Sequence, residues 1–323
     1  MTRSATLIFN PIAGQGDPEQ DLRTIWKLLE PDITLDIQLT SKEVGANELA
    51  KQAISRGIDL LIASGGDGTI SSAAEAAIGT GIPFAVIPRG TANAFAGALG
   101  LPNTIQAACE TILGGQTRVV DAATCNGQPM VLLAGIGLEA EAVEQADRES
   151  KNWLGKLAYV IAGLTKLGEI ESFEAEIEID NFVSKVQAIA VTIANAAPPT
   201  SVLAQGAAGV IADDGLLDVT IVTSVNQLEA INAMTNLLGT ALLGTAAERE
   251  DIIYLRTKRI KVTTEPAQKV VLDGELIGTP SVEIECIPGG LTVVVPATEE
   301  QTTEEATEET TEEATEETMR AFG

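Results

Sequence analysis

The chain has 323 residues, 45% of them hydrophobic and 20% charged, which is typical of a globular protein long enough for two domains. Its formal net charge of −26 and its 3% of aromatic residues exclude a nucleic-acid-binding surface, because phosphate attraction and base stacking are both missing. It contains no histidine, which excludes Ser–His and Cys–His catalytic pairs and histidine-bound zinc. Any general base is therefore a carboxylate, lysine, tyrosine or cysteine.

The first 125 residues alternate short apolar strands with helices. Strands are predicted over residues 5–9, 33–39, 58–64, 83–87 and from 119 onward, and helices over residues 18–29, 45–56, 70–78, 94–99 and 104–113. Strands separated by helices pair in parallel, because each helix carries the chain back across one face of the sheet. The sequence therefore predicts a doubly wound, mostly parallel α/β domain over residues 1–125.

Short apolar runs joined by turns fill residues 126–286. Strands are predicted over residues 130–135, 173–179, 186–193, 217–222, 260–263, 269–272 and 282–286. They indicate an antiparallel β-sandwich domain, with a barrel as the alternative, and a last strand near residues 287–296 is a candidate to return to the first domain. Two amphipathic helices, over residues 153–167 and 227–247, present apolar faces that we interpret as core packing or as the wall of an acyl-chain pocket.

The chain ends in a Thr/Glu-rich repeat over residues 297–323, with ten Glu and one Arg, which predicts a disordered acidic tail. No apolar run reaches the roughly 18 residues that span a bilayer, and the N-terminus lacks a signal-peptide pattern. The three cysteines are widely spaced and form no CxxC pair, which is typical of a cytoplasmic protein. The acidity disfavours stable docking on anionic lipid, so any membrane contact is expected to be transient. The oligomeric state stays open.

Three glycine-rich turns follow predicted strands of the first domain: residues 10–16, 65–69 and 88–93. The carboxyl ends of parallel strands meet at one edge of a sheet, and helix starts attract phosphate, so these turns indicate a nucleotide phosphate site. Asp67 lies in the second turn. A carboxylate beside a phosphate repels it unless a divalent cation lies between them, so Asp67 suggests Mg²⁺. The alternative is a glycine-rich turn with an N-capping Asp.

Two acidic turns lie in the second half. The stretch 212–218 holds Asp213, Asp214 and Asp218, and is either an ordinary hairpin turn or a site for a hard cation. Asp273-Gly274 is a common hairpin signal, and Glu275 directly after it is a candidate general base.

These pieces stand in the order found in the diacylglycerol kinase catalytic-domain family, and the chain resembles its soluble bacterial lipid kinase branch, related to sphingosine and ceramide kinases, over roughly residues 5–296. The matching pieces are Asn10-Pro11-x-Ala-Gly14, Gly65-Gly66-Asp67-Gly68-Thr69, Pro88-Arg89-Gly90-Thr91-Ala92-Asn93, Asp121, Asp213-Asp214-Gly215-Leu216-Leu217-Asp218 and Asp273-Gly274-Glu275. The second piece is shared with NAD kinases, whereas residues 90–93 and 213–218 are more specific to lipid kinases.

The resemblance implies an ATP-binding α/β domain, a lipid-binding β-sandwich domain and an active site between them. It implies phosphoryl transfer from Mg²⁺-bound ATP to the hydroxyl of a membrane lipid such as diacylglycerol, in phospholipid metabolism. It implies ATP contacts from Asn10, Ser41 (or the adjacent Thr40), Gly65, Gly66, Asp67, Gly68, Thr69, Gly90 and Thr91.

The resemblance also implies roles for acidic residues. Glu275 would be the general base with Asp273 near it, and Asp67 and Asp121 would belong to one Mg²⁺ network. A structural Mg²⁺ would be held by Asp214 and by the backbone carbonyls of Ile211 and Leu216.

The chain departs from the family pattern at three places. Ser71-Ser72 replaces an Asn-Glu pair, Ala94 replaces an Asp, and the Asn-Pro loop lacks a basic residue, which leaves Arg89 as the expected cation near the ATP phosphates. Three functions follow as hypotheses: an ATP-dependent lipid kinase, a catalytically weak nucleotide- or lipid-binding protein of the same fold, and an NAD kinase.

Overall fold

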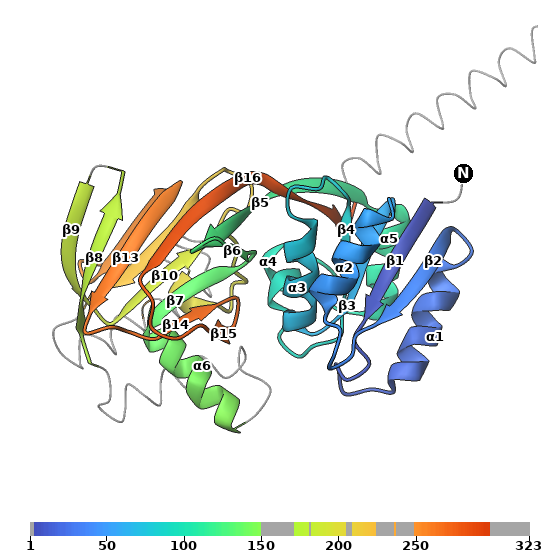
Figure 1. The fold of residues 1–323 in the computed structure, drawn as a ribbon, viewed down its shortest axis with the longest axis horizontal. Coiled ribbons are helices and arrows are strands. Elements are labelled where there is room, and N and C mark those ends of the chain that lie inside the picture. Colours follow the sequence, from blue (N-terminus) through green and yellow to red (C-terminus); the bar gives the residue numbers. More distant parts are fainter. Residues whose placement is uncertain are drawn as a thin grey trace, which may run out of the picture.

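The computed structural model describes residues 3–149, 171–180, 182–204, 209–223, 236 and 249–297. An α/β half and a β half are joined by two long strands, β5 and β16 (Figure 1). Apart from positions 236 and 297, the two helices predicted over residues 153–167 and 227–247 and the predicted acidic tail lie outside the described residues. In the part of the chain that the structure describes, no helix is long and apolar enough to cross a membrane.

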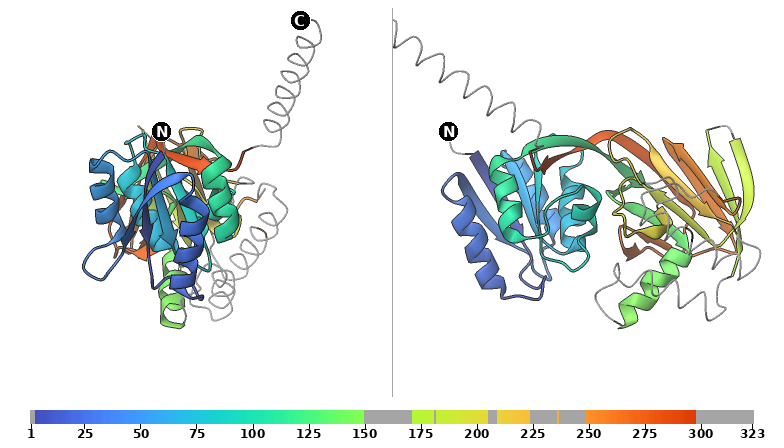
Figure 2. Two further views of the ribbon diagram at one scale, coloured as in Figure 1. Left: turned by 90° about the vertical axis from the view of Figure 1, so that its right-hand side faces the viewer. Right: turned by 180° about the vertical axis from the view of Figure 1, so that it is seen from behind.

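The α/β half is built on four parallel strands in the order β2-β1-β3-β4. These strands are β1 (Arg3–Phe9), β2 (Ile33–Leu39), β3 (Leu60–Gly65) and β4 (Phe84–Pro88). The helices are α1 (Pro18–Leu29), α2 (Ala46–Ser55), α3 (Asp67–Ala77), α4 (Ala94–Ala98) and α5 (Ile105–Gly114). They cover both faces of the sheet (Figure 2), which confirms the predicted doubly wound domain.

The two faces of this sheet bury different side chains because successive residues of a strand point to opposite sides. On β1, Leu7 and Phe9 pack with Ile25 of α1 in one core layer. Ile8 points the other way and packs with α2 and α3, where the alanine-rich sequence of α3 lets the helix lie close to the sheet. The ends of β1, β3 and β4 are thereby held at one edge.

Strand β16 (Val282–Val295) runs from the β half into the α/β half. It pairs with β5 (Gln116–Cys125) in antiparallel fashion along nearly its whole length, and its Val293 pairs in parallel with Phe84 of β4. The sequence predicted two strands, over residues 282–286 and near residues 287–296, whereas the structure has one strand with a register shift between Ile287 and Leu291. A Pro-Gly-Gly stretch permits this bulge as readily as a turn.

The β half consists of two packed sheets. Beside β5 and β16, the first contains β6 (Gln128–Met130), β8 (Phe173–Ile179), β9 (Phe182–Ala188) and β13 (Arg259–Glu265). The second contains β7 (Leu133–Gly137), β10 (Ala190–Ala194), β11 (Leu217–Val222), β12 (Ile252–Thr257), β14 (Val270–Leu272) and β15 (Glu275–Leu276). Ile260 and Ile284 of one sheet share a core with Ile136 and Val191 of the other, which confirms the sandwich.

Several elements of the β half differ from the sequence-based prediction. Helix α6 (Leu138–Glu149) and strands β12 and β15 were not predicted. The run predicted over residues 130–135 is divided between β6 and β7, and the run predicted over residues 186–193 is divided between β9 and β10. A short 3₁₀ helix, Val202–Ala204, follows β10. The sequence of α6 is rich in Glu and Ala, which are good helix formers, but it follows a strand directly without a polar turn.

Helix α6 carries a buried carboxyl group. Glu139 is 1% exposed, and its Oε2 accepts a hydrogen bond of 2.7 Å from Thr192 Oγ1 on β10. Position 135 is glycine, because a Cβ there would collide with this carboxyl group. Burial raises the pKa of Glu139 to about 7, against the weaker effect of the Thr192 hydrogen bond.

We expect Glu139→Gln to change the pH dependence of stability. Because the folded-state pKa is raised, the stability linked to the protonated carboxyl group is fully present below about pH 4.5 and is lost as the pH rises through about 7. The variant keeps a neutral acceptor for Thr192, so it should match the wild type in acid and exceed it by about 3 kcal/mol at pH 8. Urea unfolding at several pH values measures this, with the exposed Glu178→Gln as control. A constant offset at all pH values would contradict it.

Candidate functional site

A pocket of about 690 Å³ lies at the carboxyl edge of the parallel sheet. It is enclosed by the loops after β1, β2 and β3 and by the first residues of α2 and α3. Of the predicted ATP contacts, those that line it are Asn10, Ser41, Gly66, Asp67, Gly68 and Thr69, with Thr40 beside Ser41. The others, Gly65, Arg89, Gly90 and Thr91, are not among its lining residues.

Close backbone contacts bring the three glycine-rich turns together. Asn10 Nδ2 donates a hydrogen bond of 2.8 Å to Thr69 Oγ1, which ties the first turn to the start of α3. A Cβ on Gly65 would lie 2.7 Å from the Thr69 side chain, and a Cβ on Gly90 would lie 2.9 Å from the Gly66 Cα. Gly65 and Gly90 therefore shape the pocket from behind, because a larger residue at either position would push the loops apart.

Asp67 is the first residue of α3 and its carboxylate caps another helix, α4. Its Oδ2 accepts from Asn93 N at 3.1 Å, and its Oδ1 accepts from Ala94 N at 2.5 Å. Burial raises the pKa of Asp67, and these amide hydrogen bonds oppose the shift. Asp67 lines the pocket and its carboxylate is the kind of oxygen donor that Mg²⁺ prefers, so it is the residue there that could hold such an ion.

Arg89 is not among the residues that line the pocket, and its predicted contact with the ATP phosphates stays a prediction. Its side chain is 2% exposed, its Nε donates to Asp21 Oδ2 at 2.8 Å, and its Nη1 donates to the Asn10 carbonyl oxygen at 2.8 Å. Its guanidinium also lies 4.2 Å from the centre of the Phe9 ring. The sequence could not show that Asp21 of α1 reaches this arginine. Arg89 therefore holds the Asn10 turn in place.

Lys42 is the cationic side chain that the sequence analysis missed. It is exposed and follows Ser41 in the loop after β2, and among the pocket's described lining residues it is the one with a positive charge. The sequence feature that could have identified Lys42 is its position. It follows the predicted ATP contact Ser41, shortly after a strand whose end was expected at the ligand-binding edge of the sheet.

A second pocket of about 320 Å³ lies between α3 and the β14–β15 hairpin, and it shares Gly68 and Ser72 with the first. Glu275, the predicted base, is exposed at the start of β15 and lines this second pocket. The connecting turn has φ values of 47° at Asp273 and 92° at Gly274, as expected for an Asp-Gly hairpin. The hairpin thus brings Glu275 opposite the start of α3.

Asp273 anchors this hairpin to the start of β7. Its carboxylate accepts hydrogen bonds from the backbone amides of Val131 at 2.8 Å and of Leu132 and Leu133 at 2.9 Å each. Burial nevertheless raises the pKa of Asp273 to about 7, because these three bonds offset only part of the desolvation. The carboxylate that the sequence placed near the base is therefore engaged in fixing the position of Glu275.

Glu75 is a third acidic residue that lines this pocket, after Glu275 and Asp273, and no role was predicted for it from the sequence. Burial raises the pKa of Glu75 most, and the negative charge of Glu275 raises it further. Asn47 Nδ2 donates to Glu75 Oε2 at 3.3 Å and to the Ser72 carbonyl at 3.0 Å. The sequence did contain an indication of a role for Glu75. It is the one acidic residue of α3 after Asp67, and it follows Asp67 by eight residues, which places both on the same side of the helix.

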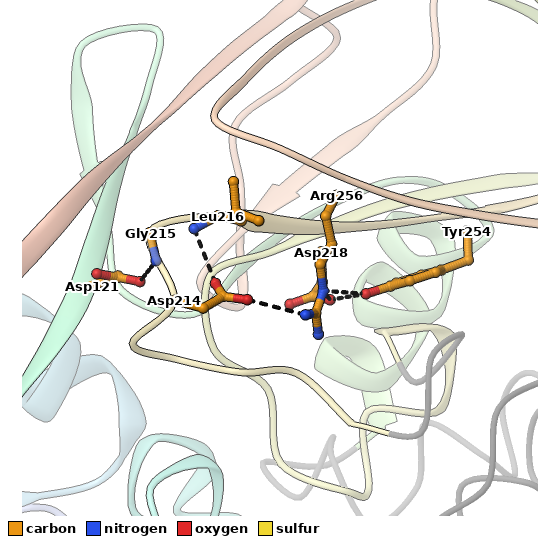
Figure 3. Close-up of polar contacts among 7 residues, drawn as sticks. All are labelled: Asp121, Asp214, Gly215, Leu216, Asp218, Tyr254 and Arg256. Atoms are coloured by element: carbon orange, nitrogen blue, oxygen red, sulfur yellow. Dashed lines mark hydrogen bonds and ion pairs between the residues drawn. The ribbon is translucent and has the colours of Figure 1, made fainter.

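In the acidic turn over residues 212–218, the carboxylates of Asp214 and Asp218 are paired with Arg256 (Figure 3). Asp214 Oδ1 accepts from Leu216 N at 3.0 Å, and Asp214 Oδ2 pairs with Arg256 Nη1 at 3.1 Å. A divalent ion bound to Asp214 would lie beside the Arg256 guanidinium, so the donors present do not fit the structural Mg²⁺ that was expected on Asp214, Ile211 and Leu216.

Asp121 is also placed differently from the expectation. Its Oδ2 accepts from Gly215 N at 2.6 Å, and its Oδ1 accepts from Gly289 N at 2.8 Å in the β16 bulge. Asp67 binds the amides at the start of α4 instead, so the structure does not bring these two carboxylates into one network. Both carboxylates accept hydrogen bonds from backbone amides, but in different places.

Comparison with known proteins assigns both halves of the chain. The family model for the diacylglycerol kinase catalytic domain matches residues 4–125, and the model for the YegS C-terminal NAD kinase beta sandwich-like domain matches residues 133–295. The chain belongs to the diacylglycerol kinase family. It is thus a lipid kinase, a phosphotransferase with an alcohol as acceptor.

Relatives of this lipid kinase cover most of its length. It is 50% identical over 306 residues to an uncharacterized protein of Synechocystis sp., covering 91% of this chain and 71% of that protein. It is 32% identical to the diacylglycerol kinase of Bacillus subtilis, covering 85% and 91% of the two chains. A crystal structure described as a diacylglycerol kinase from Bacillus anthracis matches with a TM-score of 0.69 and 27% identity, covering 91% and 97%.

We expect Lys42→Met to weaken ATP use without weakening the fold. If the ATP phosphates bind in this pocket, loss of its lining cation should raise the KM for ATP about tenfold, equivalent to about 1.4 kcal/mol. Arg89→Met should lower the melting temperature, because it leaves the Asp21 carboxylate without its partner. Steady-state kinetics and thermal unfolding of both variants test this, with the exposed Lys27→Met as control. An unchanged KM in Lys42→Met would contradict the assignment.

Proposed function

We propose that this lipid kinase transfers the γ-phosphate of Mg²⁺-bound ATP to the free hydroxyl of a membrane lipid such as diacylglycerol, with Glu275 as general base. The observation that carries the proposal is that the two pockets share Gly68 and Ser72. A nucleotide in the larger pocket can then present its terminal phosphate to an acceptor beside Glu275. Because such an acceptor lies in a bilayer, the protein would contact the membrane transiently.

The larger pocket has the features that phosphate binding needs. Helices α2 and α3 both begin at it, with Ala46 and Asp67 as their first residues, so their unpaired amides and positive dipole ends face an anion. The Asn10 and Thr69 side chains, bonded to each other, would fix the position of the phosphates, and Asp67 would hold the Mg²⁺ that accompanies ATP. That ion supplies charge neutralisation at the transferring group.

In the smaller pocket, Glu275 would accept the proton of the lipid hydroxyl as its oxygen attacks the γ-phosphorus and the bond to ADP breaks. Proton removal comes late in a loose transition state, so alignment and charge stabilisation contribute most of the acceleration. Asp273 would serve as a positioning residue, because its three hydrogen bonds to backbone amides fix the hairpin that carries Glu275.

The smaller pocket also favours an uncharged acceptor. Glu75 and Glu275 line opposite sides of it, and its described lining residues include no cation. A lipid with a phosphate next to its hydroxyl would be repelled by both carboxylates, whereas a neutral alcohol can donate its hydrogen bond to either. This supports diacylglycerol-like acceptors over anionic lipid alcohols.

Glu275→Gln should abolish most of the transfer. Gln keeps the size of the side chain but cannot take a proton, and general bases typically contribute about 10²–10⁴-fold. We expect kcat to fall by at least about 100-fold with the KM for ATP unchanged. The assay follows label from γ-labelled ATP into a total lipid extract in detergent micelles, with the exposed Glu285→Gln as control. A variant with near wild-type kcat would refute the role of Glu275.

Glu75→Gln should relax the preference for neutral acceptors. Removing one negative charge from the pocket should raise the relative kcat/KM for phosphatidylglycerol over diacylglycerol about fivefold, equivalent to about 1 kcal/mol. Paired kinetics with the two lipids measure the ratio, and Glu48→Gln on the neighbouring helix α2 is the control. If the ratio is the same in both variants, Glu75 does not select the acceptor.

A catalytically weak nucleotide-binding protein is the second candidate function, and Ala94 favours it. This residue is 3% exposed at the start of α4 and offers a methyl group where the family pattern has a carboxylate. ATP binding without any labelled lipid would support this alternative, and Ala94→Asp would then be the variant to compare.

A further inference from the structure

We propose that the Arg256 guanidinium takes the place of a divalent cation at the acidic turn over residues 212–218, so that the turn is closed without bound metal. Arg256 lies on β12, next to the turn, and its side chain points at two of the turn's carboxylates (Figure 3). The proposal concerns how the fold is braced and is independent of the transferred group.

Arg256 bridges the two ends of the turn. Its Nη1 lies 3.1 Å from Asp214 Oδ2 and its Nε lies 2.9 Å from Asp218 Oδ1. The Asp218 side chain is fully buried, whereas that of Arg256 is 29% exposed, so the guanidinium covers Asp218 from the solvent side. A planar guanidinium with donors fixed in a fork suits two carboxylates held at a set separation.

Tyr254 completes this arrangement from the same strand. Its hydroxyl donates to Asp218 Oδ1, and its ring centre lies 5.9 Å from the Arg256 guanidinium carbon. Burial and the charge of Asp218 raise the pKa of Tyr254 to about 12, so its hydroxyl stays a donor. Asp218 thus receives two donors from β12.

A divalent ion would disrupt these contacts. To bind Asp214, Mg²⁺ needs a carboxylate oxygen at about 2.1 Å in a near-octahedral shell. Asp214 Oδ2 already pairs with Arg256 Nη1, so an ion bound to either oxygen of this carboxylate would lie close to the positive charge of Arg256. If Arg256 moved away, the buried Asp218 carboxylate would lose its countercharge, which is strongly unfavourable.

The braced turn bears on the junction between the two halves. Its Gly215 amide donates to Asp121 of β5, and the other oxygen of that carboxylate accepts from Gly289 in the β16 bulge. Arg256 is therefore connected to β5 and β16, the two strands that join the halves, through the turn and the hydrogen bonds of Asp121. The fold would then need no bound Mg²⁺, and the reaction would use the Mg²⁺ that accompanies ATP.

Thermal unfolding of the full chain without nucleotide tests the proposal, with either EDTA or millimolar MgCl₂ present. The variants are Arg256→Met, Asp214→Asn and, as matched control, Arg259→Met, whose partner Glu283 is exposed. We expect the wild-type melting temperature to be the same with EDTA and with Mg²⁺. Arg256→Met should melt about 5 °C lower, and Arg259→Met within about 1 °C of the wild type.

Two results would overturn the proposal. One is a rise in the wild-type melting temperature with Mg²⁺ that Asp214→Asn abolishes, which would place a metal on the turn. The other is an Arg256→Met protein as stable as the Arg259→Met control. If Arg256→Met does not fold, Mn²⁺ binding followed by electron paramagnetic resonance decides: equal binding by the wild type and Asp214→Asn supports the proposal, and loss of one ion in the variant refutes it.

Discussion

The pairing of β5 with β16 is the constraint on which the arrangement of the site depends. These strands are hydrogen-bonded to each other in both halves, and β16 pairs with β4 at one end and with β13 at the other. The two halves therefore share one sheet instead of meeting only through a flexible linker. Because β7 and β14 pack on that sheet, the hairpin that carries Glu275 is held opposite α3, and the smaller pocket exists only through this pairing.

Backbone amides at loops and helix starts also need hydrogen-bond acceptors, and in this fold carboxylates repeatedly supply them. Asp67 accepts from the start of α4, Asp273 from three successive amides before β7, and Asp121 from the turn and the β16 bulge. All three stand in pieces that mark the family. Several of its acidic signature residues are thus needed for loop geometry here, and Glu275, whose carboxylate lines a pocket without a comparable amide cluster, is set apart from them.

The sequence predicted those parts of the structure that depend on local pattern. Alternating strands and helices gave the parallel domain, and turn-separated apolar runs gave the sandwich, because each pattern restricts which faces can be buried. Strand β16 was predicted as two strands, since the Pro-Gly-Gly stretch is compatible with a bulge or a turn and only long-range pairing with β5 decides between them. The ion pair between Arg89 and Asp21 was missed for the same kind of reason, because the two residues are 68 positions apart in sequence. The roles of Asp67 and Glu275 stay predictions from motif and placement.

Electrostatics divide the site into two parts with opposite preferences. In the larger pocket, which is the proposed nucleotide site, two helix starts and Lys42 are among the lining features, and they would partly offset the acidity of the chain for a bound anion. On the acceptor side, Glu75 and Glu275 make the pocket negative. The phosphoryl group would have to cross from one side to the other past Gly68 and Ser72, where neither side chain carries charge. Because Gly68 and Ser72 are small and neutral, they would separate the Glu75 and Glu275 carboxylates from the phosphates and still let the acceptor hydroxyl approach the γ-phosphorus. A serine at position 72, where the family pattern has an acid, is therefore compatible with transfer.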